Sequence, residues 1–255
     1  MITDFEGKLG VVSGAGGGIG REIARQLHGR GMRVGLLDID EPTLFETRAL
    51  LGAGAAAFIC DVSDQRSVEA AAARVREDLG ATDILINCAG RLGPFEKRIW
   101  EYDNDEWAGL LDVNLYGVIN CVRTFLPVLR ASTSAAHIAI IASTAGVLPQ
   151  HCAGAYAASK HALVSFGETL CLELEAEHAN VGVSIVCPGA VRTNFNAAVR
   201  ASRPGVGEGG AGWQGPDDVA ACVLRSLESG SLYGFTHGES RAKLEEYHRL
   251  LASFA

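Results

Sequence analysis

Residues 9–20 read LGVVSGAGGGIG, an apolar run that leads directly into a cluster of glycines. The run from Leu9 to Gly14 predicts a buried strand, and the spacing of apolar residues from Ile19 to His28 predicts an amphipathic helix. Glycines between them allow the backbone to approach a pyrophosphate closely, and the helix points its free N–H groups and positive dipole end at the phosphates. Such a turn also occurs in ordinary loops, but its place at the first strand–helix junction favours a dinucleotide-binding loop.

Short apolar runs alternate with amphipathic, alanine-rich segments along the rest of the chain. Continuous apolar strands separated by helices are typical of a parallel sheet covered on both faces, and right-handed crossovers make it a doubly wound, Rossmann-type sheet. We therefore predict a single α/β domain over residues 1–255. The expected strands are 9–14, 32–38, 55–61, 83–90, 137–143, 181–189 and 232–236, and the expected helices are 19–28, 63–79, 105–130, 153–177 and 239–253, with one more beginning at 215–218.

The composition limits the classes of partner. A formal net charge of −8 gives no electrostatic reason to bind nucleic acid or an anionic membrane, so we expect a small-molecule partner. The seven cysteines show neither CxxC nor metal-ligand spacing, which predicts reduced thiols in a cytoplasmic protein without a metal site. The start, MITDFEGK, lacks the features of a signal peptide, and no apolar run approaches membrane-spanning length.

Asp38, at the end of the second expected strand, indicates which dinucleotide is bound. A carboxylate there accepts hydrogen bonds from both hydroxyls of the adenosine ribose and repels a 2′-phosphate. The alternative is that Asp38 only ends a strand and begins a turn. Its sequence distance after the glycines favours a role in binding the ribose. Gly17 also offers no basic side chain to a 2′-phosphate. Both features predict NAD rather than NADP as the cofactor.

Further motifs follow in a fixed order, and together they resemble the short-chain dehydrogenase/reductase (SDR) family from about Lys8 to Tyr233. The family's TGxxxGxG loop corresponds to residues 13–20, with Ser13 in place of threonine, and its NNAG motif corresponds to residues 87–90, with Cys88 in the second place. The other matches are Asp61-Val62, Asn114, Ser143, the YxxxK pair Tyr156 and Lys160, and PGxVxT at Pro188, Gly189, Val191 and Thr193. The resemblance implies an enzyme that moves a hydride between NAD and a secondary alcohol or its ketone. The cofactor-binding residues so implied are Gly14, Gly17, Gly18, Ile19, Gly20, Asp38, Asp61, Val62, Asn87, Ala89, Gly90, Tyr156, Lys160, Pro188, Gly189, Val191 and Thr193.

The expected catalytic residues suit this chemistry. Oxidation of an alcohol needs a base, and Tyr156 is the candidate, although a free tyrosine has a pKa of about 10. Lys160 follows at i+4 on the same helix face, so we expect its ammonium to lower the pKa of the phenol. Ser143 ends the fifth expected strand and is placed to hydrogen-bond the substrate oxygen. By resemblance, Lys160 also binds the nicotinamide ribose, and Asn114 supports a helix distortion and a water that relays protons to Lys160.

The substrate is defined less sharply. Ser143, Ala145, His151 and Tyr156 are the expected substrate residues, and the neighbourhood is mostly apolar. Residues 193–215, rich in glycine, predict a lid that closes over ligand. The tail from Leu232 is similar to SDR enzymes that act on bulky, often aromatic, alcohols. By resemblance, the two long helices of residues 105–130 and 153–177 pair with their copies, which predicts a homo-oligomer, a tetramer or dimer.

Two alternatives remain open at this point. A dinucleotide-sensing Rossmann protein without catalysis would have no need of the Ser–Tyr–Lys set, whose presence argues against that reading. An SDR-type epimerase or dehydratase would use the same residues and is not excluded by them.

Overall fold

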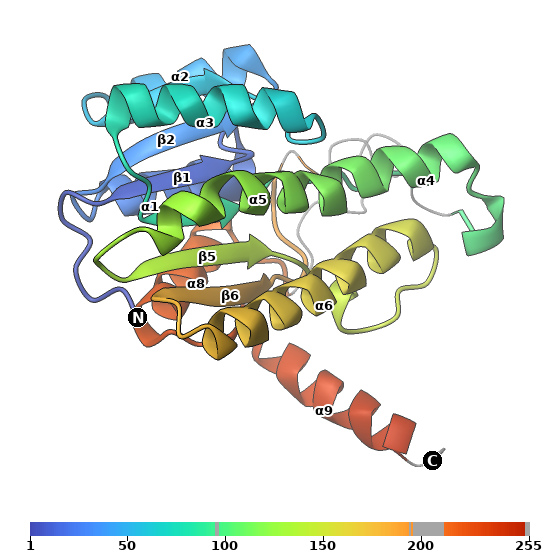
Figure 1. The fold of residues 1–255 in the computed structure, drawn as a ribbon. Coiled ribbons are helices and arrows are strands. Elements are labelled where there is room, and N and C mark those ends of the chain that lie inside the picture. Colours follow the sequence, from blue (N-terminus) through green and yellow to red (C-terminus); the bar gives the residue numbers. More distant parts are fainter. Residues whose placement is uncertain (95–96, 194, 196–211, 253–255) are drawn as a thin grey trace.

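Seven parallel strands form one continuous sheet in the part of the chain that the structure, a computed structural model, describes: residues 1–94, 97–193, 195 and 212–252. Their order is β3-β2-β1-β4-β5-β6-β7 (Figure 1). The direction of winding reverses between β1 and β4, and in such sheets ligands bind at this switch point, beyond the carboxyl ends of the strands. The strands are β1 (Leu9–Ser13), β2 (Arg33–Asp38), β3 (Ala55–Ile59), β4 (Ile84–Asn87), β5 (Ala136–Ile141), β6 (Val181–Cys187) and β7 (Tyr233–Phe235).

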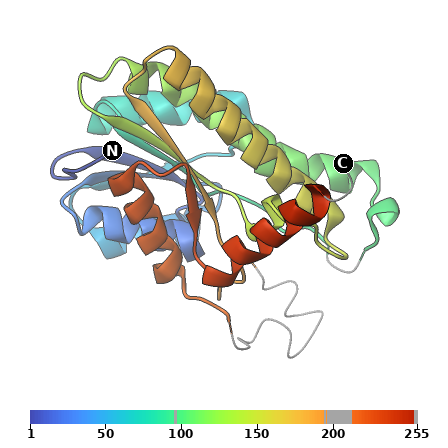
Figure 2. The same cartoon turned by 90° about the horizontal axis from the view of Figure 1, so that it is seen from below.

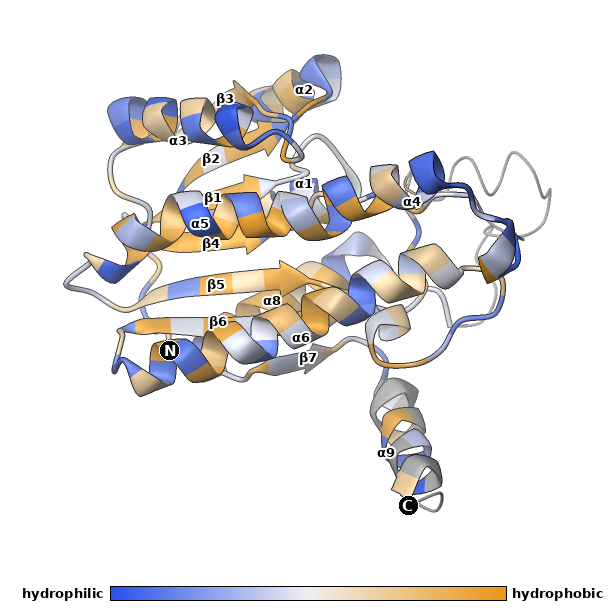
Figure 3. Cartoon of the chain, turned by 45° about the vertical axis from the view of Figure 1, so that its right-hand side comes forward, coloured by the Kyte–Doolittle hydropathy of each residue, from blue (hydrophilic) through white to orange (hydrophobic). Residues whose placement is uncertain are grey.

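Helices cover both faces of the sheet, as the view in Figure 2 shows. Adjacent residues of β1 serve the two faces, because side chains alternate along a strand: Val12 packs in a cluster with Ile23, and Val11 packs in another with Phe125. Figure 3 shows hydrophobic residues concentrated along the strands. One face carries α1 (Gly18–His28), α2 (Glu41–Leu51) and α8 (Pro216–Ser229), and the other carries α3 (Gln65–Leu79), α5 (Gly117–Arg130) and α6 (Gly154–Ala176). The predicted doubly wound α/β fold is confirmed.

Most element bounds agree with the sequence pattern, but the expected strands extend too far at their carboxyl ends. Strand β4 ends at Asn87 rather than Gly90, and β6 ends at Cys187 rather than Gly189. At these points the chain leaves the sheet and turns into the loops that carry the site.

Helix α2 has no counterpart in the sequence-based prediction. Only Leu44 and Thr47 of this helix are buried, so its amphipathic pattern is too weak to detect. Its start nevertheless carries recognisable signals, because the Asp40 side chain caps the N–H of Thr43 at 3.3 Å and a proline occupies the first turn.

The helical region expected at 105–130 is three consecutive helices. Helix α4 (Asn104–Leu111) and α5 are joined by a π-helical turn, Asp112–Tyr116. Such single-turn insertions in helices often lie at functional sites. Two short 3₁₀ helices lie in the loops that follow β4 and β5: Ile99–Glu101 and Thr144–Gly146.

The expected lid at 193–215 falls largely on residue 194 and residues 196–211, which lie outside the described residues. Its two ends are held together: Arg192 N–H donates to Gln214 O at 2.9 Å, and Gln214 N–H donates to Ala190 O at 3.0 Å. The final helix, α9 (Gly238–Ala252), extends away from the body of the molecule (Figure 1). Among the described helices, none has the length and apolarity needed to cross a bilayer.

Candidate active site

A cleft of about 1140 Å³ opens at the carboxyl edge of the sheet. It runs from the β1–α1 turn and the end of β2, past the ends of β4 and β5, to the segment after β6. This is the switch point of the strand order, where a doubly wound sheet binds its ligand. The structure therefore brings the sequence motifs into one continuous site.

The β1–α1 turn requires glycine at specific positions. A Cβ on Gly14, whose φ is +69°, would lie 2.8 Å from the backbone of Ala89, and a Cβ on Gly20 would lie 2.1 Å from the carbonyl oxygen of Gly14. Gly17, in contrast, has no atom within 4 Å of such a Cβ, so its backbone is open to the cleft, just before the N-terminus of α1. An open backbone beside free helix N–H groups fits a dinucleotide pyrophosphate.

The end of β2 presents an anchored carboxylate to the cleft. Gly16 N–H donates to Asp38 Oδ2 at 2.8 Å, and Asp40 N–H donates to Asp38 Oδ1 at 3.0 Å. These two bonds fix the orientation of the carboxylate, and its oxygens retain lone pairs for further donors. The geometry therefore fits recognition of ribose hydroxyls, and it fits a 2′-phosphate poorly.

The other end of the cleft holds the Ser–Tyr–Lys set. Ser143 follows β5, and its Oγ accepts the N–H of Ala145 at 3.1 Å. Tyr156 and Lys160 lie on α6, and the Lys160 Nζ is 5.8 Å from the centre of the Tyr156 ring. The Lys160 ammonium donates to the carbonyl oxygen of Ile141 at 3.0 Å, which fixes the side chain under the cleft. The ring of Phe195 lies 6.5 Å from that of Tyr156, so an aromatic side chain borders the reactive end.

The expectation that Lys160 lowers the pKa of Tyr156 is wrong for the chain itself. Burial raises the pKa of Tyr156 to about 12, and a hydrogen bond with Ser143 only partly opposes this. Burial also lowers the pKa of Lys160 to about 8. Desolvation disfavours both charged forms, and the Lys160 ammonium is directed at the Ile141 carbonyl, so burial has the larger effect on the phenol.

Asn114 lies in the π-helical turn, fully buried, so the helix distortion expected there is present. Its Oδ1 accepts the N–H of Arg91 at 2.7 Å, and its Nδ2 donates to the carbonyl oxygen of Arg91 at 2.9 Å and to Ser159 Oγ at 3.0 Å. A Cβ on Gly90 would lie 3.3 Å from Asn114 Oδ1 and 3.7 Å from Lys160 Nζ, so the two polar groups flank this glycine. Asn114 thereby ties the segment after β4 to α6.

Every other sequence-predicted site residue lines the cleft except two. Asn87 is buried behind it, and neither atom of its side-chain amide is hydrogen-bonded to a residue that the structure describes. His151 is exposed, and Gln150 and Ala153 line the cleft beside it instead. Lining residues that the sequence motifs did not identify include Gly16, Arg21, Ile39, Asp40, Thr43, Glu46, Ser63, Cys88, Arg91, Val113 and Ala153. Several of these residues lie on α2 or just before it. They were not predicted as site residues because the sequence pattern did not predict that helix.

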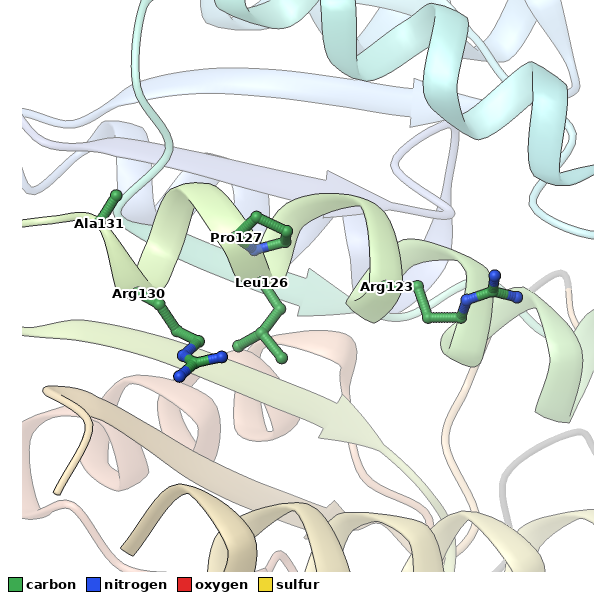
Figure 4. A pocket seen from close by; sticks show the side chains of 5 residues that line it. All are labelled: Arg123, Leu126, Pro127, Arg130 and Ala131. Atoms are coloured by element: carbon green, nitrogen blue, oxygen red, sulfur yellow. The ribbon is translucent and has the colours of Figure 1, made fainter. Parts of the chain in front are cut away.

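A second depression, of about 600 Å³, lies on the outer surface of α5 (Figure 4). Leu126 and Pro127 form its apolar part, and Arg123 and Arg130 lie on either side. None of these residues belongs to the cleft, so this depression is separate from the candidate active site. Arg130 forms an ion pair with Glu177 just after α6, which joins α5 to α6 at this surface.

The doubly wound sheet, the glycine loop and the Ser–Tyr–Lys set define a Rossmann-type oxidoreductase. Residues 8–204 match the family described as short chain dehydrogenase, and the chain belongs to that family. It is similar to the probable oxidoreductase EphD of Mycobacterium tuberculosis, at 37% identity over 80% of this chain but only 34% of that protein. The chain therefore spans about a third of the length of that relative.

Two further similarities extend over nearly the whole chain. The 1-deoxy-11-beta-hydroxypentalenate dehydrogenase of Streptomyces exfoliatus is 31% identical over 94% of this chain and 86% of its own length. The crystal structure of a short chain dehydrogenase/reductase from Burkholderia phymatum in complex with NAD superposes with a TM-score of 0.88 at 33% identity, covering 98% of this chain and 95% of that chain.

Proposed function

We propose that the protein is an NAD-dependent oxidoreductase acting on a secondary alcohol or its ketone. The observation that carries this proposal is the joint placement, in one cleft, of the anchored Asp38 carboxylate and the Ser143, Tyr156 and Lys160 side chains. When bound, the nicotinamide supplies the hydride acceptor or donor. The Asp38 carboxylate accepts hydrogen bonds from the adenosine ribose and selects against a 2′-phosphate.

The chain's own residues provide the proton chemistry. In oxidation, the Tyr156 oxygen takes the proton of the substrate hydroxyl, and in reduction it returns that proton to the carbonyl oxygen. The Ser143 hydroxyl donates a hydrogen bond to the substrate oxygen and stabilises the charge that develops there. The Lys160 ammonium, held by the Ile141 carbonyl, hydrogen-bonds the ribose of the cofactor and orients it.

The lining of the reactive end supports a bulky, apolar or aromatic substrate. Leu92, Ala145, Val191 and Trp213 line this part of the cleft together with the Phe195 ring. The 1-deoxy-11-beta-hydroxypentalenate dehydrogenase named above is a relative whose name gives a hydroxylated substrate, which is consistent with action on an alcohol. We place the enzyme in the cytoplasm, since its seven cysteines are unpaired thiols.

We also propose that the protein assembles as a homo-oligomer, a tetramer or dimer, through α5 and α6. Leu172 on α6 is 66% exposed, and the half-buried Leu126 and the exposed Pro127 form the apolar part of the depression on α5 (Figure 4). Exposed apolar residues gathered on adjacent helices are typical of surfaces that bind another chain.

The direct test is the appearance of NADH absorbance when the protein is mixed with NAD and a panel of secondary alcohols, from short aliphatic to bulky aromatic. We expect turnover with the bulky members, and higher kcat/KM with NAD than with NADP. Higher kcat/KM with NADP than with NAD would overturn the proposed cofactor. Inversion of a stereocentre of the substrate with no accumulation of NADH would favour the alternative of an epimerase.

A further inference from the structure

Arg21 occupies a central position between the glycine loop and α2, although no step of the proposed chemistry uses it. It lies in the first turns of α1, at the edge of the cleft, and its side chain is 31% exposed. Its guanidinium donates through Nη2 to the carbonyl oxygens of Gly16, at 2.5 Å, and Thr43, at 3.1 Å. Through Nε it donates to Thr47 Oγ1 at 2.8 Å. One side chain thus links the glycine loop to two successive turns of α2.

The residue on which this link converges is Gly16, and Gly16 is also the residue that holds Asp38. The carbonyl oxygen of Gly16 accepts from Arg21, while its N–H donates to Asp38 Oδ2 at 2.8 Å. The contact is tight: a Cβ on Gly16 would lie 2.6 Å from Thr43 Oγ1 and 2.9 Å from Asp38 Oδ2. The carbonyl held by Arg21 and the N–H that holds Asp38 belong to the two peptide groups on either side of the Gly16 Cα, so fixing the first restrains the residue that orients the carboxylate.

We propose that Arg21 is a positioning residue for cofactor selection, which fixes Gly16 so that its N–H holds the Asp38 carboxylate toward the adenosine ribose. This inference rests on the proposed use of NAD. A guanidinium suits the task because its planar fork reaches several acceptors at once, which an ammonium on a flexible stem does not. The Arg21 Nε and Nη2 are engaged within the protein, with Thr47, Gly16, Thr43 and Glu46 as acceptors.

The backbone acceptors, and not the ion pair with Glu46, carry this role. Glu46 Oε2 is 3.3 Å from Arg21 Nη2, but the Glu46 side chain is 64% exposed, and exposed ion pairs contribute little. Thr47 is fully buried, and its Oγ1 also donates to the carbonyl oxygen of Thr43 at 3.1 Å. Thr43 and Thr47, which both accept from Arg21, are therefore held rigidly.

The test measures dissociation constants of NADH and NADPH by fluorescence for the full chain and its variants. Arg21→Met should weaken NADH binding about tenfold, the loss expected for a hydrogen bond to a charged group. NADPH affinity should change less, because its 2′-phosphate gains nothing from the carboxylate, so the preference for NADH narrows. The matched control is Arg25→Met on the same helix, since the Arg25 guanidinium donates to Glu22, at 2.7 and 2.8 Å, outside the cleft.

Two further variants separate positioning from a purely structural role. Arg21→Lys keeps the positive charge but not the planar guanidinium, so it should also weaken NADH binding. It replaces Arg21→Met in the test if Arg21→Met does not fold. In an Asp38→Ala background, Arg21→Met should add less than about a twofold loss, because the carboxylate that it positions is gone. An undiminished tenfold loss in that background, or equal losses for NADH and NADPH, would overturn the inference. A wild type that binds NADPH more tightly than NADH would instead overturn the proposed function.

Discussion

The buried imidazole of His137 should make the stability of this fold depend on pH. His137 lies on β5, fully buried, and its Nε2 is 2.9 Å from Ser184 Oγ, whose hydroxyl donates to the carbonyl oxygen of Ser231 at 2.7 Å. Because that hydroxyl proton is already used, the serine oxygen accepts from a protonated Nε2, and Nδ1 has no hydrogen-bond partner among the described residues. A second proton on Nδ1 would be buried without an acceptor, so burial lowers the pKa of His137 from 6.5 to about 4.

The magnitude follows from the linkage between protons and folding. Between pH 6.5 and about 4, the unfolded chain binds a proton at His137 that the folded protein does not, so the free energy of unfolding falls as the pH is lowered. At about 1.4 kcal/mol per pKa unit, the full loss is about 3 kcal/mol, reached below about pH 4. This is a large part of the stability of an ordinary domain.

Urea unfolding at a series of pH values from neutral to about 4 measures this term. His137→Gln removes the titrating group and keeps a donor for Ser184. Between neutral pH and about pH 4, the free energy of unfolding of this variant should therefore fall by about 3 kcal/mol less than that of the wild type. His161→Gln, an exposed position on α6, is the matched control and should follow the wild type. Parallel curves for the wild type and His137→Gln would refute the argument, whatever their offset at neutral pH.

The remaining predictions concern the site and the assembly. Asp38→Ala should raise the KM for NAD by about tenfold and narrow the preference over NADP, as measured by steady-state kinetics; an unchanged preference would remove Asp38 from cofactor selection. Tyr156→Phe should lower turnover at least about a hundredfold while NADH still binds by calorimetry, and near-normal turnover would exclude Tyr156 as the proton acceptor. Leu172→Glu should reduce the mass measured by light scattering, whereas Leu50→Glu, 71% exposed on α2, should not; a monomeric wild type at micromolar concentration would contradict the assembly.

The fold and the local motifs could be predicted from the sequence because they depend on contacts close in the chain. The glycines of the first turn, the i+4 pair of Tyr156 and Lys160, and the alternation of strands and helices are of this kind. The network of Arg21, Gly16 and Asp38 could not be predicted, because it needs α1, β2 and α2 side by side in space. His151 illustrates the same limit, since its nearness to Tyr156 in sequence did not place it in the cleft.

The electrostatics of the site were the part in which sequence reasoning failed, and the failure leads to a prediction. An ammonium at i+4 suggests a phenol that ionises easily, whereas burial raises the pKa of Tyr156 to about 12 and lowers that of Lys160 to about 8. The phenol is then protonated throughout the neutral range, which suits an acid for ketone reduction. Its ionised fraction, the form that accepts a proton from an alcohol, rises about tenfold for each pH unit.

The rate of alcohol oxidation should therefore climb with pH through the neutral and mildly alkaline range, while the rate of ketone reduction changes little there. The measurement is kcat/KM in both directions across this range, at saturating cofactor, with the melting temperature followed in parallel to exclude unfolding. An oxidation profile that levels off near neutral pH would mean that the phenol ionises with a pKa near 7 in the working enzyme. In that case the attraction between Tyr156 and a neighbouring cation outweighs desolvation, and the original reasoning from the spacing of Tyr156 and Lys160 is restored.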